Sequence, residues 1–72
     1  MTNTDLLEAK IKASGLKKQY LAAECGLTPN GFRNCCHNRA EFKASQIEIL
    51  CQLLKITSLA ERQAIFFAKV VH

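Results

Sequence analysis

The feature that most constrains this chain is the run Cys25-Gly26-Leu27-Thr28-Pro29, in which a helix stop is followed almost at once by a helix start. Glycine adopts the left-handed backbone conformation that ends a helix without the steric cost of a Cβ atom. Threonine is a good N-cap, and proline suits the first helical position because an N–H there would have no partner. The run therefore predicts two helices joined by a turn of about three residues.

The residue types on either side of this turn indicate how the two helices pack. The small residue Ala22 lies four positions before Gly26, and the large apolar residue Phe32 lies six positions after it. Ala22 lets the helices approach closely, and Phe32 locks the second helix across the first. This pattern is typical of a helix-turn-helix, whose second helix presents its outer face rigidly. We predict this motif over about residues 17–38.

The remainder of the chain has helical periodicity and almost no β-strand signal. A first helix is expected from the N-cap Thr4 to the stop at Ser14-Gly15, and the second over about residues 17–25. The third begins at Pro29. The apolar positions expected to face the core in these helices are Leu6, Leu7, Ile11, Ala13, Leu21, Ala22, Cys25, Phe32 and Cys35.

Two further helices are expected in the C-terminal part, over about residues 45–70. The fourth starts at Ser45, or two residues earlier, and carries the apolar stripe Ile47, Leu50, Cys51 and Leu54. The fifth, capped by Thr57 or Ser58, runs from residue 59 to about residue 70. With 49% hydrophobic and 22% charged residues the chain is globular. Residues 1–72 are thus expected to form one all-α domain, a compact bundle of about five short helices.

Four cysteines, at positions 25, 35, 36 and 51, raise the question of a disulfide, metal or catalytic site. The N-terminal residues have neither the basic start nor the apolar run of a signal peptide, so we expect a cytoplasmic protein with free thiols. Adjacent helical residues point about 100° apart, so Cys35 and Cys36 would not share one metal ion. We expect Cys25, Cys35 and Cys51 to be buried and Cys36 to be partly exposed, with no metal and no cofactor.

Catalysis and membrane insertion are also not expected. Cys36 and His37 are sequence neighbours without an orienting acid or a recognisable cleft, so we predict neither an enzyme nor a small-molecule substrate. The longest apolar stretch, residues 64–71, is interrupted by Lys69 and is far too short to span a membrane.

The charge distribution favours an anionic partner. The net charge is +4, and residues 17–43 supply +3 of it, with five basic residues against two acidic ones. A basic field centred on one short segment suggests attraction to phosphate groups, although an ordinary solvated surface is the alternative.

The segments "GLKKQYLAAECGLTPNGFRNCCHN" and "EFKASQIEILCQLLKIT" resemble the small Cro/Xre-type helix-turn-helix regulators of temperate phages, over about residues 5–68. In length and sequence the chain most resembles the modulator-of-repression proteins encoded beside lactococcal phage repressors. The resemblance implies a regulator of a lysis/lysogeny switch, in the cytoplasm of a bacterial host. Its partners would be double-stranded operator DNA, the phage repressor protein, or both.

Transferred position by position, the resemblance also implies site residues. Base edges would be read from the start of the third helix by Thr28, Pro29, Asn30, Arg33, Asn34 and His37. Phosphates would be contacted by Lys17, Lys18, Gln19, Arg39 and Lys43. The chain departs from the family at two positions where glutamine is frequent, which here hold Lys18 and Pro29. Because Pro29 has no hydrogen-bonding side chain, weak base specificity is expected.

The fifth helix has more apolar residues than one buried stripe requires. We expect its surplus face, with Ile65, Phe67 and Val70, to bind a second copy of the chain or another protein. Two interpretations therefore remain open: a Cro-like DNA-binding transcription regulator, or an antirepressor whose main ligand is the phage repressor.

Overall fold

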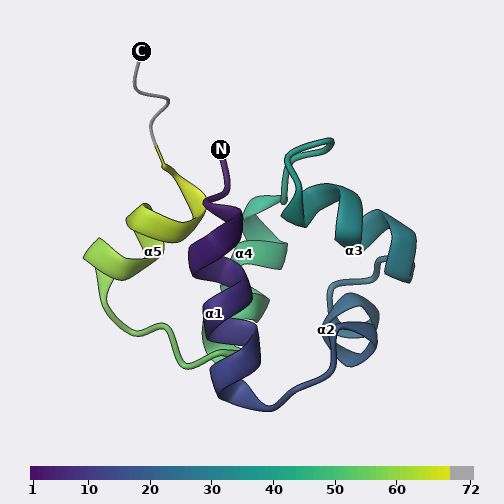
Figure 1. Ribbon diagram of the computed structural model, residues 1–72, viewed down its shortest axis with the longest axis horizontal. Coiled ribbons are helices and arrows are strands. Elements are labelled where there is room, and N and C mark those ends of the chain that lie inside the picture. Colours follow the sequence, from purple (N-terminus) through teal and green to yellow (C-terminus); the bar gives the residue numbers. More distant parts are fainter. Residues whose placement is uncertain (69–72) are drawn as a thin grey trace.

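Five α-helices follow one another without a β-strand between residues 1 and 68, the part of the chain that this computed structural model describes. They are α1 Thr4–Ser14, α2 Lys18–Glu24, α3 Pro29–Cys36, α4 Ala44–Leu53 and α5 Leu59–Phe66. In Figure 1, α1 crosses the centre of the molecule, with α5 on one side, α2 and α3 on the other, and α4 behind. The predicted all-α bundle of about five short helices is confirmed.

The first four helices are each followed by a residue in the left-handed conformation. The φ angles are 73° at Gly15, 71° at Gly26, 64° at Asn38 and 57° at Lys55. After α2, the Gly26 N–H donates to the Ala23 carbonyl at 3.0 Å and the Leu27 N–H donates to the Ala22 carbonyl at 2.8 Å. This pair of hydrogen bonds is the Schellman motif, so the predicted helix stop at Gly26 is confirmed.

The start of α1 differs from the prediction. Asn3 Oδ1 accepts a hydrogen bond from the Leu6 N–H at 3.2 Å, so Asn3 is the N-cap and Thr4 is already helical. The Thr4 hydroxyl instead donates to the Cys36 carbonyl at 2.6 Å, which connects α1 to the end of α3. The expectation that Thr4 caps α1 is therefore wrong, because a tertiary partner takes its hydroxyl.

The starts of α4 and α5 are also set by side chains. The N-cap of α4 is Lys43, so the earlier of the two predicted starts is the correct one. Its N–H donates to Oε1 of the buried Gln46 at 2.8 Å, and Gln46 Nε2 donates to the Cys25 carbonyl at 3.3 Å. Gln46 thus joins α4 to the end of α2. Ser58, one of the two predicted caps, accepts from the Glu61 N–H at the start of α5.

The hydrophobic core lies between the helices. Its buried residues are Leu7, Ile11, Leu21, Ala22, Cys25, Phe32, Cys35, Cys36, Phe42, Ile47, Leu50, Cys51, Leu54, Ile56, Ile65 and Phe66. Phe42, in the loop after α3, meets Phe32 and Phe66 edge to face, at centroid distances of 5.8 and 5.9 Å. Such aromatic pairs are favourable beyond the area they bury. They connect α3 to α5 across the core.

Four expectations about burial are corrected by this packing. Leu6 and Ala13 are exposed, because α1 buries the narrower stripe of Leu7 and Ile11. Cys36 is only 2% exposed and belongs to the core together with Cys35, at a point where Thr4 of α1 bonds to the Cys36 carbonyl. Ile65 is 1% exposed and belongs to the core.

An N-terminal clip, formed by residues 1–4, joins the ends of α3 and α5. Thr2 exchanges two hydrogen bonds with the side-chain amide of Asn38, at 2.8 and 2.9 Å. The Asn3 N–H donates to the Ile65 carbonyl, and the Ala68 N–H donates to the Met1 carbonyl at 2.9 Å. Helix α5 ends at Phe66 with Phe67 as its C-cap, and Ala68 bonds to the N-terminal segment, so the expected continuation of α5 to about residue 70 is wrong within the described residues.

Candidate nucleic-acid interface

The polar face of α3 is the most prominent candidate site. Thr28, Asn30, Arg33 and His37 are exposed, and Asn34 is half-buried. The opposite face of the helix, with Phe32, Cys35 and Cys36, is buried. The spacing of three and four residues therefore places Asn30, Arg33 and His37 together on one exposed face, with Thr28 before the helix as its N-cap.

Local structure holds this face in a fixed orientation. Ala22 on α2 and Phe32 on α3 are each 1% exposed, so both residues that were expected to pack between these helices are buried. Thr28 Oγ1 accepts from the Gly31 N–H at 3.0 Å, and Pro29 occupies the first helical position. A Cβ atom at Gly31 would lie 3.1 Å from Thr28 Oγ1, so a side chain there would press on the cap. The start of α3 is thus fixed by its cap, its turn and its buried face.

The predicted phosphate-binding residues lie at element ends around α3. Lys17 is the N-cap of α2, Lys43 is the N-cap of α4, and Arg39 lies in the loop after α3; all three are exposed. Among the described residues, none of these three takes part in an ion pair, and neither does Arg33. Their charges are therefore available to an anionic partner.

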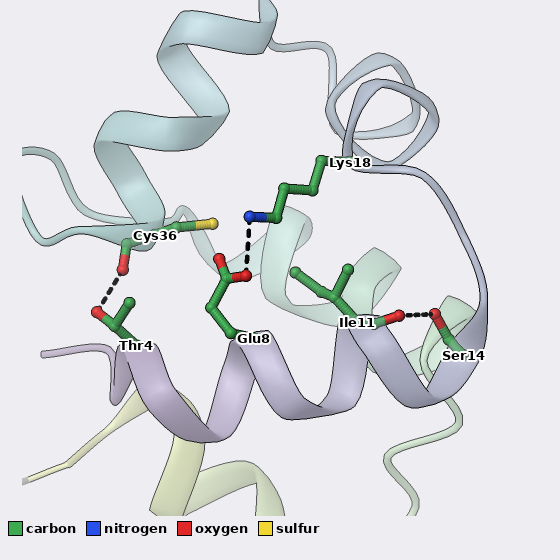
Figure 2. A network of polar contacts seen from close by, with 6 residues as sticks. All are labelled: Thr4, Glu8, Ile11, Ser14, Lys18 and Cys36. Atoms are coloured by element: carbon green, nitrogen blue, oxygen red, sulfur yellow. Dashed lines mark hydrogen bonds and ion pairs between the residues drawn. The ribbon is translucent and has the colours of Figure 1, made fainter.

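Lys18 differs from these basic residues. Its Nζ lies 2.8 Å from Oε2 of Glu8 on α1, and the two side chains are 55% and 35% exposed. Figure 2 shows the Lys18 side chain reaching from α2 to this carboxylate, with the Cys36 sulfur pointing toward the same group. The other carboxylate oxygen, Oε1, is buried and has no hydrogen-bond partner among the described residues.

An open hollow of about 400 Å³ lies where α1, α2 and α3 meet. Its rim is formed by Glu8, Lys18, Gln19, Pro29, Arg33 and His37. It brings two predicted phosphate contacts, Lys18 and Gln19, next to two predicted base contacts, Arg33 and His37. Arg39 and Lys43 do not line it. Glu8 is the residue of this hollow that the sequence prediction missed, because nothing in its local sequence indicates a partner ten residues away on another helix.

The cysteines behave as buried structural residues. Burial raises the pKa of Cys25 and Cys35, and it raises that of Cys36 to about 12, with a further contribution from the Glu8 carboxylate and an opposing one from Lys18. A thiol with a raised pKa carries little of the nucleophilic thiolate form. All four cysteines are reduced and buried, so the predicted burial of Cys25, Cys35 and Cys51 is confirmed. Within residues 1–68 no group of three or more metal-ligating side chains is assembled.

The predicted partner face of the fifth helix is not assembled as expected. Ile65 is buried in the core and Phe67 is 55% exposed, so the two side chains point in different directions. Val70 lies outside the described residues. Leu59, which is 68% exposed, lines a shallow surface hollow with Phe67 instead.

Comparisons with protein-family models, with curated proteins and with solved structures gave no significant match to this chain. In the described part of the chain, every helix is too short or too polar to cross a membrane. Fold and site together define a small all-α protein that presents one short, hydrogen-bonding helix face beside unpaired basic residues.

Proposed function

We propose that this protein is a Cro/Xre-type transcription regulator that places α3 in the major groove of double-stranded operator DNA, as part of a phage lysis/lysogeny switch. The observation that carries the proposal is the exposed face of α3. Asn30, Arg33 and His37 share it, above a buried face that fixes the orientation of the helix.

The chemistry of this face suits base recognition. Arginine pairs bidentately with guanine, and asparagine pairs bidentately with adenine, in the major groove. In this mode Arg33 and Asn30 read base edges, and Lys17, Arg39 and Lys43 contact phosphates on either side. No acidic residue occurs between residues 25 and 40, so nothing in this segment repels the DNA backbone. The half-buried Asn34 is less available for base contact than the other three polar residues.

A second function, that of an antirepressor, is favoured by different observations. Pro29 and Gly31 contribute no hydrogen-bonding side chain to the start of α3, and Lys18 is engaged by Glu8. Base and phosphate contacts would then be few for a monomer. In this mode the chain binds the phage repressor and covers the repressor's own DNA-binding surface. The exposed apolar side chains of Phe67 and Leu59 offer a contact area for the repressor or for a second copy of the chain.

A mobility-shift series separates the two functions. Duplexes from the promoter region beside the gene are mixed with this protein, with the repressor, and with both. A shift by this protein alone, reduced for one particular base pair by Arg33→Ala, supports direct DNA binding. The antirepressor function predicts no shift by this protein alone, and loss or a further shift of the repressor–DNA complex. If neither DNA nor repressor responds, both proposals are wrong.

A further inference from the structure

Glu8 is an acidic residue inside an otherwise basic and neutral hollow. Of the residues that line the hollow between α1, α2 and α3, Glu8 is the only acidic one, whereas Lys18 and Arg33 are basic. Its carboxylate forms an ion pair with Lys18, with 2.8 Å between Glu8 Oε2 and Lys18 Nζ. A DNA phosphate that approached the start of α2 would therefore meet Lys18 already paired with the Glu8 carboxylate.

The Glu8 carboxylate is partly buried between the helices. Its Oε2 lies 2.8 Å from Lys18 Nζ, whereas Oε1 is buried and has no hydrogen-bond partner among the described residues, so the Lys18 ammonium is the group that compensates this charge. Figure 2 shows the Cys36 sulfur pointing toward the same carboxylate. Lys18 is the more exposed and the more flexible partner. Moving Lys18 to a phosphate would therefore leave a partly buried carboxylate without its ion-pair partner.

We infer that Glu8 limits the DNA affinity of this surface by holding Lys18 away from the phosphate backbone. The inference rests on the proposed DNA-binding function and adds the residue that tunes it. In the protein as it stands, Lys18 contributes little to binding, whereas Lys17, Arg39 and Lys43 contribute fully. Replacing Glu8 by an uncharged residue of the same shape frees Lys18 for one further phosphate contact.

The expected size of the change in DNA affinity follows from counterion release. One additional phosphate contact steepens the slope of log K against log salt concentration by about 0.9. Where the variant and the unchanged protein bind equally at about 1 M salt, this slope difference gives the variant roughly eightfold higher affinity at about 0.1 M salt, independent of DNA sequence.

The test measures binding to a labelled, mixed-sequence DNA duplex by fluorescence anisotropy, between about 50 and 200 mM NaCl. Glu8→Gln is compared with the unchanged protein, with Lys18→Gln and with the double variant. The matched control is Glu61→Gln, which removes the same charge and the Lys10–Glu61 ion pair of 2.9 Å. This control pair lies between α1 and α5, on the other side of α1 from α3 (Figure 1).

The expected result is a steeper salt slope for Glu8→Gln, no such change for Glu61→Gln, and loss of the gain in the double variant. Lys18→Gln by itself should leave the slope nearly unchanged, and this exposed substitution tests the inference even if Glu8→Gln does not fold. Equal gains in Glu8→Gln and Glu61→Gln would show an effect of net charge alone and overturn the inference. So would an unchanged slope in Glu8→Gln, or a large loss in Lys18→Gln, while the unchanged protein binds. Absence of binding by every variant at low salt would instead refute the DNA-binding function itself.

Discussion

Asn38 combines two structural contributions in one side chain and backbone position. Its backbone is in the left-handed conformation, with φ of 64°, and it ends α3. Its amide accepts from the Thr2 N–H at 2.8 Å and donates to the Thr2 carbonyl at 2.9 Å. It therefore terminates one helix and also holds the N-terminal clip.

Two substitutions separate these contributions. Asn38→Gly removes the two hydrogen bonds but also removes a Cβ atom from the left-handed region, so the free energy of unfolding should fall by less than the about 1 to 3 kcal/mol that two such hydrogen bonds contribute. Asn38→Ala removes the same hydrogen bonds but keeps a Cβ atom in the left-handed region, so it should be about 1 to 2 kcal/mol less stable than Asn38→Gly. In a domain of this size each kcal/mol lowers the melting temperature by roughly 4 to 8 °C.

Urea denaturation followed by circular dichroism measures both variants, and hydrogen exchange at the Thr2 and Ala68 amides reports whether the clip has opened. Both amides should exchange faster in Asn38→Gly, because the clip loses its attachment to α3. An alanine variant as stable as the unchanged protein would refute the contribution of the clip. Equal stabilities of the glycine and alanine variants would refute the argument from backbone conformation.

Further substitutions test the site and the helix ends. Arg33→Ala should lose about 1 to 3 kcal/mol of binding at one base pair, whereas Lys43→Ala should weaken all duplexes alike and reduce the salt slope by about 1; identical effects on every duplex in a binding panel would argue against base readout. Lys55→Gly should raise the free energy of unfolding by roughly 1 kcal/mol or less, seen as a higher urea midpoint. The reason is that Lys55 has φ of 57°, a left-handed conformation that glycine adopts without the steric cost of a Cβ atom. The free energy of unfolding should fall as the pH rises from about 9 toward about 12, because burial raises the pKa of Cys36 from 9.0 to about 12 and the folded state then binds the thiol proton more tightly. Below pH 9 this contribution is fully present, and in Cys36→Ala the alkaline decrease measured by urea titration should be smaller.

Much of the α2–α3 unit was predictable because its determinants are local. Gly26 ends a helix through its own backbone freedom, Thr28 caps the next helix through a hydrogen bond three residues along, and Pro29 is tolerated only at a helix start. The exposed face of α3 follows in the same way, since residues at spacings of three and four share one side of a helix. The structure confirms each of these sequence predictions.

Other features required contacts between distant segments. Asn3 and Thr4 are both acceptable caps for α1, and the hydrogen bond from Thr4 to the carbonyl of Cys36 decides between them. Cys36 was expected to be partly exposed because it adjoins the inward-facing Cys35, yet both are buried. The periodicity of a helix predicts one buried face, and it does not show whether another helix also covers a second face.

The sequence by itself determined where the helices lie, with small errors at their ends, and which side chains of α3 stand together, because both depend on backbone conformations and spacings within a few residues. Only the tertiary structure decided where α5 ends, that Ile65 enters the core, and that Glu8 forms an ion pair with Lys18. Each of these depends on which element packs against which. The pairing of charges between helices is therefore settled by packing and cannot be read from local pattern alone.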